Sequence, residues 1–235
     1  GARAATGRTP VGLCGRPATP PPPRAAGPGE RVTSVWRRPP APRPLPCPAS
    51  TPAGAAPPRH GLRDNGLAAL SPSAVTLAER AREKGLATAA FVGALVLDRQ
   101  YGLDQGFEVY DQPARPAQQV SSRYAERGAE EVLAAAESWL AGLEPTQRFL
   151  LWVHLFDPHA PYEAPERFLA QVANQAGQGH PYIAEVAKVD HELGRFLDAL
   201  RARGTLDRAL LMVVADHGED LLDHGEPNHA AFVYD

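Results

Sequence analysis

Two residues with metal-ligating side chains, Asp216 and His217, directly follow a short apolar run in the last part of the sequence. Two further histidines, His224 and His229, come soon after them. A carboxylate beside an imidazole is a donor set for a divalent metal ion, which can activate or clamp an anionic oxygen. The same residues also fit a plainer interpretation, a solvated acidic loop in which Asp216 and His217 cap a strand end through hydrogen bonds.

A second candidate is His159, in the sequence DPHAPY. Pro158 and Pro161 interrupt a hydrogen-bond ladder and stiffen the chain, so they present His159 from a rigid turn after a predicted strand. An imidazole held in this way can hydrogen-bond a substrate oxyanion or protonate a leaving oxygen. We therefore predict His159 as a catalytic, substrate-contacting residue, the alternative being an ordinary turn residue. His154, inside the apolar run before it, is predicted to be a buried, hydrogen-bonded core residue.

The elements that must position these side chains alternate between helix and strand. The apolar run 210–214 predicts a strand buried on both faces of a parallel sheet. Amphipathic periodicity and capping signals predict the other elements: helices at 76–84, 129–143 and 180–203, strands at 88–92 and 149–156, and a short edge strand near 107–109. This order indicates an α/β fold with a mostly parallel, doubly wound sheet. Ligands in such folds collect at the carboxyl ends of the strands, so we expect His159 and the Asp216/His217 pair to share one cleft.

The N-terminal segment, residues 1–58, differs in composition from the rest, being dominated by Ala, Pro, Arg and Gly. Such a segment buries too little apolar surface to offset its chain entropy, and we predict that it is disordered or polyproline-II-like. Pro20 to Arg24 would fit an SH3-like partner, whereas a plain linker is the simpler interpretation. A third hypothesis is that the residues before about Pro57 are out of frame, because a wrong reading frame in GC-rich DNA gives this composition.

Composition and charge restrict the class of protein. With a formal charge of -3 and 43% hydrophobic residues, the chain has the profile of a globular domain without the basic field of a nucleic-acid-binding protein. No apolar run reaches the roughly 18 residues of a membrane span. No apolar signal region follows Arg3 and Arg8. A periplasmic or extracellular location remains open if such a signal was lost with the N-terminus. Cys14 and Cys47 could pair in an oxidising compartment, but nothing requires it.

Several stretches stand in a characteristic order along the chain. They are HGLRDNG (60–66), TAAFVGALVLDRQYGLDQGFEVYD (88–111), FLLWVHLFDPHAPYEAPERF (149–168), and ADHGED with the following DHGE and NH (215–229). Together they resemble the sulfatase family within the alkaline-phosphatase-like superfamily. The resemblance implies an incomplete alkaline-phosphatase-like domain over residues 59–235. It also implies metal-dependent hydrolysis of sulfate esters, that is, of a small anionic ester substrate.

The resemblance further implies roles for individual residues. Asp216 and His217 would bind the metal, and His159 would contact the sulfuryl group. His229 would contact the substrate as well, or serve as a further metal ligand. The resemblance makes calcium the expected metal, since a hard ion fits an oxygen-rich site, while zinc or manganese would suit a site richer in imidazole.

The sequence departs from the family pattern in two places. Gly93 to Val96 stand where the arylsulfatase branch carries a Gly-Lys-Trp-His motif, so both anion contacts of that motif are missing, and the slot of the nucleophile falls near Pro44. We therefore expect a fragment that is weakly active or inactive as written. Two alternatives stay open: a phosphodiesterase or phosphotransferase of the same superfamily, and a noncatalytic binding protein with a Pro-rich arm.

Overall fold

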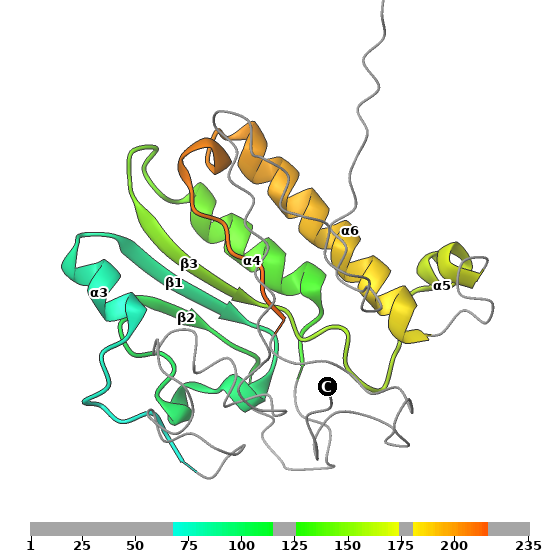
Figure 1. The fold of residues 1–235 in the computed structure, drawn as a ribbon, viewed down its shortest axis with the longest axis horizontal. Coiled ribbons are helices and arrows are strands. Elements are labelled where there is room, and N and C mark those ends of the chain that lie inside the picture. Colours follow the sequence, from blue (N-terminus) through cyan, green and yellow to red (C-terminus); the bar gives the residue numbers. More distant parts are fainter. Residues whose placement is uncertain (1–67, 115–125, 174–180, 216–235) are drawn as a thin grey trace, which may run out of the picture. The chain divides into compact units, whose positions relative to one another are not determined.

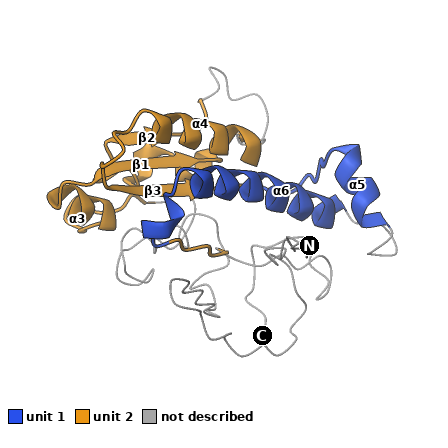
Figure 2. Cartoon of the chain, turned by 90° about the horizontal axis from the view of Figure 1, so that it is seen from above, with its two compact units in different colours: residues 1–35, 157–210 blue, residues 36–156, 211–235 orange. Residues whose placement is uncertain are grey.

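The computed structural model describes residues 68–114, 126–173 and 181–215 (Figure 1). The chain divides into two compact units (Figure 2). Of the described residues, the helical unit comprises 157–173 and 181–210, and the sheet unit comprises 68–114, 126–156 and 211–215. The N-terminal segment 1–58, predicted to be disordered, lies outside the described residues, so that prediction is not tested.

A parallel sheet of three strands in the order β2-β1-β3 forms the centre of the sheet unit. The central strand β1 (Ala87–Val92) pairs with β2 (Val109–Asp111) on one side and with β3 (Phe149–His154) on the other. The register places the three carboxyl ends together, since Phe91 is opposite Asp111 and Val92 is opposite His154. The predicted α/β class with a parallel sheet and the strands predicted at 88–92 and 149–156 are confirmed, although β3 ends at His154, before the predicted Phe156.

Alternate side chains of β1 point to opposite sides of the sheet, and both sides are covered. Phe91 faces α4 (Ala129–Ala141), where its ring centroid lies 6.3 Å from that of Trp139. Ala90 and Val92 belong to a core cluster on the opposite side. That cluster includes Leu70, Ala94, Val96, Leu97, Leu103 and Tyr110. Its loop residues come in part from two short 3-10 turns, η1 (Leu95–Leu97) and η2 (Arg99–Tyr101).

The helix predicted at 76–84 is confirmed as α3 (Leu77–Glu83), and its capping signal is confirmed as well. The Thr76 hydroxyl accepts the Glu79 backbone N–H at 3.1 Å, and the Glu79 carboxylate accepts the Thr76 N–H at 2.7 Å. This reciprocal pair satisfies donors that the first turn of a helix leaves unpaired. Gly85 then leaves the helix with φ 73°, a left-handed conformation that glycine adopts easily.

The helical unit contains α5 (Glu166–Ala173), α6 (Pro181–Ala202) and the short turn η3 (Leu206–Arg208). Phe168 and Val172 of α5 pack with Ala184 of α6 in a small buried cluster. The His191 ring lies 5.8 Å from the Phe168 ring, so His191 has a packing role. The long helix predicted at 180–203 is therefore confirmed.

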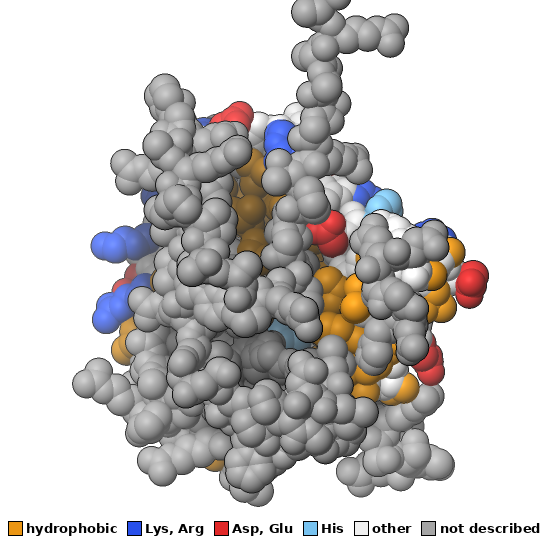
Figure 3. All heavy atoms as spheres, turned by 45° about the vertical axis from the view of Figure 1, so that its right-hand side comes forward, with side chains coloured by type: hydrophobic (Ala, Val, Ile, Leu, Met, Phe, Trp, Pro, Cys, Tyr) orange, Lys and Arg blue, Asp and Glu red, His pale blue; other side chains and the backbone are white. Residues whose placement is uncertain are grey.

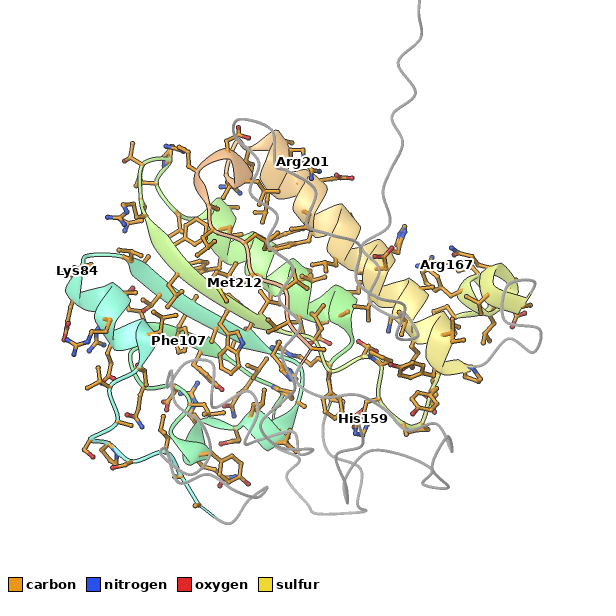
Figure 4. The ribbon with its side chains drawn as sticks, in the orientation of Figure 1. Lys84, Phe107, His159, Arg167, Arg201 and Met212 are labelled. Carbon is orange, nitrogen blue, oxygen red and sulfur yellow. The ribbon has the colours of Figure 1, made fainter. Side chains whose placement is uncertain are left out.

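The strand predicted at 210–214 is wrong in the structure, where these residues belong to no strand. Their side chains are 47% to 88% exposed, the most exposed being Leu210. The physical reason is that an apolar run predicts burial but supplies no hydrogen-bonding neighbour, and a parallel strand forms only beside another strand. Figure 4 shows Met212 on this extended segment.

Charged side chains are spread over the surface that the described residues present in Figure 3, and they form no single basic field on that face. Apolar side chains are also visible there between them. Among the described residues, no helix combines the length and apolarity that crossing a membrane requires.

Candidate functional site

Of the predicted site residues, the structure describes only His159. Asp216, His217 and His229 lie outside the described residues, and so does His224. The structure therefore does not test the prediction that His159 and the Asp216/His217 pair share one cleft. The geometry available concerns His159 in the helical unit and the carboxyl edge of the sheet in the sheet unit.

His159 lies on the segment 157–163, which we call the exit turn because it follows β3 in the sequence (Figure 4). The two X-Pro bonds in this turn, Asp157–Pro158 and Ala160–Pro161, are both cis. The His159 Nδ1 atom lies 2.8 Å from the Ala160 carbonyl oxygen. A carbonyl can only accept, so Nδ1 carries the hydrogen of this bond, and the lone pair of the neutral ring is on Nε2.

The exit turn is bound to α6 by two charged side chains. The Glu185 carboxylate accepts backbone N–H groups of His159, at 3.2 Å, and of Glu163, at 2.8 Å. Lys188, one helical turn further along, forms an ion pair with Asp157 at 3.1 Å. Burial raises the pKa of Glu185, the two backbone hydrogen bonds and Lys188 act in the opposite direction, and burial is the largest effect.

At the carboxyl edge of the sheet, Arg127 holds the ends of β1 and β2. Its guanidinium donates to the Val92 carbonyl at 2.9 Å and to the Asp111 carbonyl at 3.2 Å, and it forms an ion pair with the Asp111 carboxylate. Its backbone N–H donates to Gly93 at 2.7 Å. Because its charge is paired with Asp111 and only 11% of its side chain is exposed, Arg127 is a structural clamp rather than an anion contact.

The segment Gly93 to Val96 supplies no polar side chain to this edge. A Cβ on Gly93 would lie 3.1 Å from the Phe156 nitrogen and 3.2 Å from the Arg127 carbonyl oxygen, so the backbone is closely packed there. Ala94 and Val96 are buried in the apolar cluster. The structure thus agrees with the sequence that the anion contacts of the Gly-Lys-Trp-His motif are missing from this position.

Two other buried polar groups near this edge have structural roles. The Asp98 carboxylate accepts the Gln100 N–H at 2.8 Å and the Gln112 side-chain amide at 2.9 Å. The Tyr110 hydroxyl donates to the Leu97 carbonyl at 2.7 Å, and burial raises the pKa of this hydroxyl above its usual value. Neither group is arranged for proton transfer to a ligand.

A metal site is not formed by the described residues alone. Across 68–114, 126–173 and 181–215, no group of three or more His, Cys, Asp or Glu side chains is placed to hold a metal ion. The carboxylate of Asp157, the acidic residue closest in sequence to His159, is paired with Lys188. Ligands of a metal ion would therefore have to come from outside the described residues, where the predicted ligands Asp216 and His217 lie.

Three residues with roles in this geometry were not predicted from the sequence: Glu185, Lys188 and Arg127. A signal for Glu185 was present, because residues 185, 189, 192 and 196 share one helix face, and Val189 and Phe196 on that face are apolar. A carboxylate on an apolar stripe indicates a buried partner. Nothing in the sequence connects Arg127 with the ends of β1 and β2.

Comparison with known proteins gives a consistent result. The family model described as Sulfatase matches residues 53–232. An arylsulfatase from Clostridium perfringens (strain 13 / Type A) is 40% identical over 43 residues, which cover 18% of this chain and 9% of that protein.

Two solved structures resemble the fold. The yidJ protein of Bacteroides fragilis aligns with a TM-score of 0.62 and 19% identity over 81% of this chain and 55% of that chain. The phosphonate monoester hydrolase of Agrobacterium radiobacter aligns with a TM-score of 0.61 and 17% identity over 83% of this chain and 57% of that chain. At these identities the structures show a shared fold, and the present chain spans a little over half of each of them.

Proposed function

Because this chain belongs to the sulfatase family, we propose that the protein hydrolyses sulfate esters of small molecules with the help of a divalent metal ion. The observation that carries the proposal is the match to the sulfatase model over residues 53–232, a range that contains the exit turn and the Asp216/His217 pair. Members of this family generally depend on a divalent metal, which agrees with the donor set in that range.

His159 is the proposed contact to the sulfuryl group or the leaving oxygen. With the Nδ1 hydrogen bonded to the Ala160 carbonyl, the proton that this ring gains and loses is on Nε2. A proton held there can be donated to the leaving oxygen of an ester, and the charged ring can stabilise an anionic oxygen. His229 is proposed for the second substrate contact or for a further metal ligand.

Asp216 and His217 are the proposed metal ligands. When bound, a divalent ion neutralises charge on the nonbridging oxygens of the ester and makes a nearby nucleophile more acidic. We favour calcium because carboxylate oxygens suit a hard ion, and manganese or zinc would be favoured if imidazoles dominate the site.

The proposal is tested by calorimetric titration of the full chain with calcium and manganese, followed by titration with inorganic sulfate and vanadate. Asp216→Ala is expected to abolish metal binding. His159→Ala is expected to leave metal binding intact and to weaken anion binding on the order of 10-fold, the loss of one charge-assisted hydrogen bond. The matched control is His191→Ala, since His191 packs against Phe168 on α5.

Hydrolysis of 4-nitrophenyl sulfate, with 4-nitrophenyl phosphate for comparison, gives the second measurement. Turnover is expected to be slow because Pro44, which has no nucleophilic side chain, stands near the slot of the nucleophile. Any turnover should require the metal ion and His159. Three results would contradict the assigned roles. They are turnover without metal, anion binding that is unchanged in His159→Ala, and hydrolysis at rates typical of the family in both Asp216→Ala and His159→Ala. Faster hydrolysis of the phosphate ester would assign the protein to the other reaction class of the superfamily.

A further inference from the structure

Glu185 is a charged residue in a position that otherwise suits an apolar one. It is 4% exposed and lies on the face of α6 that carries the buried residues Val189 and Phe196. Removing a carboxylate from water is unfavourable unless hydrogen bonds replace its hydration. Each oxygen of Glu185 accepts a backbone N–H of the exit turn, Oε2 from His159 and Oε1 from Glu163.

A second charged contact binds the start of the same turn. Lys188 Nζ lies 3.1 Å from Asp157 Oδ1, and their side chains are only 17% and 15% exposed. Ion pairs shielded in this way are screened less by salt than pairs on the open surface. Tyr162 adds an apolar contact, with its ring 5.6 Å from the Tyr182 ring of α6 in an edge-on arrangement. Helix α6 therefore holds the exit turn near both of its ends and at its centre.

The centre of the turn is His159, whose backbone and ring are both fixed. Its N–H donates to Glu185, and its Nδ1–H donates to the next carbonyl, that of Ala160. These two bonds set the position of the residue and the tautomer of its ring. A displacement of about 1 Å at a reacting group can cost about 100-fold in rate, so a group that fixes this residue affects catalysis without touching the substrate.

We propose that Glu185 and Lys188 are positioning residues that hold the exit turn on α6 and thereby aim the His159 imidazole at the substrate. The inference rests on the proposed function for its catalytic meaning. It extends that function to two residues of α6, which act through the position of His159.

The test compares Glu185→Gln with Glu192→Gln in the full chain. Both glutamates are buried on α6, at 4% and 5% exposed, but the Glu192 carboxylate has its ion pair with Arg195 on the same helix. A glutamine at 185 can accept one of the two N–H groups, while its own NH₂ would face the other donor. Amide hydrogen exchange of His159 and Glu163 and the ¹⁵N spectrum of the His159 ring are measured in all variants.

In Glu185→Gln, exchange at His159 or Glu163 is expected to accelerate on the order of 10-fold, which corresponds to one lost hydrogen bond to a charged group. The His159 ring is expected to move from the single Nδ1–H tautomer toward a mixture. Glu192→Gln should change neither measurement. Unchanged exchange and tautomer in Glu185→Gln, or equal changes in both variants, would overturn the inference.

Lys188→Met keeps the test decisive if Glu185→Gln fails to fold, because the Lys188–Asp157 pair is less buried than Glu185. It should accelerate exchange at His159 while far-UV circular dichroism stays unchanged, and no acceleration would count against the inference. Sulfate binding separates the two proposals. If His159→Ala weakens sulfate binding and Glu185→Gln does not, the positioning role of Glu185 is rejected and the proposed function stands. If His159→Ala has no effect on sulfate binding, the proposed function is rejected.

Discussion

Gly106 is the position where a single added methyl group should disturb the sheet unit most. Its φ is 86°, in the left-handed region, and it lies against the start of α3. A Cβ at this position would overlap the Glu79 backbone nitrogen and would lie 2.7 Å from the Ala78 carbonyl carbon. Both atoms belong to helix backbone, so no side chain can rotate away to make room.

The loop cannot retreat without losing hydrogen bonds on both sides. Thr76 donates its hydroxyl hydrogen to the Gln105 carbonyl at 2.9 Å, and Thr88 donates to the Gly106 carbonyl at 2.8 Å. The left-handed conformation costs an alanine about 1 to 2 kcal/mol, partly offset by lower entropy of the unfolded chain. Overpacking adds about 1 to 3 kcal/mol. We expect Gly106→Ala to lower the free energy of unfolding by about 3 kcal/mol, or roughly 6 to 12 °C in Tm.

Gly85 is the matched control, because its φ is 73° and a Cβ there would meet no atom within 4 Å. Gly85→Ala tests the conformational cost alone, which we expect at about 1 kcal/mol. Urea denaturation followed by circular dichroism measures both variants. Equal losses in the two variants would refute the argument from close packing, and a Gly106→Ala protein as stable as the parent would show that the contact with α3 is not formed.

Three further perturbations test other contacts. Arg127→Met removes the donor that binds the Asp111 carboxylate and the Val92 and Asp111 carbonyls, so urea denaturation should show a loss of about 2 to 4 kcal/mol. Arg80→Met breaks the exposed ion pair with Glu83 and should lower the free energy of unfolding by under about 0.5 kcal/mol. Similar losses of stability in Arg127→Met and Arg80→Met would contradict the role of Arg127 as a clamp. Burial raises the pKa of Glu185 above its usual 4.5, so the stability of the parent relative to Glu185→Gln should fall as pH rises through that raised value, and a difference independent of pH would argue against it. Val213→Lys should reduce aggregation in light scattering because it places a charge in the exposed apolar run, and unchanged scattering would mean that the run is covered in solution.

Local signals predicted much of the fold because each element carries its own pattern. The Thr76 and Glu79 spacing specified the capping box of α3, and the apolar stripes specified α4 and α6. These features depend on residues a few positions apart, which helix geometry brings together without help from the rest of the chain.

Residues 210–214 differ, because their apolarity alone predicts a strand that the structure does not form. Strand formation depends on a ladder with a neighbour that is distant in sequence, as in the pairing of β1 with β3. An apolar run without such a ladder stays exposed, as the side chains of Leu210 and Met212 are.

Sequence patterns were sufficient for the α/β class, the sulfatase resemblance and the place of His159 between Pro158 and Pro161. Three-dimensional contacts were needed to identify Glu185 as the buried acceptor of the His159 N–H and Arg127 as the clamp on β1 and β2. Glu185 is 26 residues from His159, and Arg127 is 35 residues from Val92. Contacts over such separations follow from how packed elements meet, and no spacing rule along the chain encodes them.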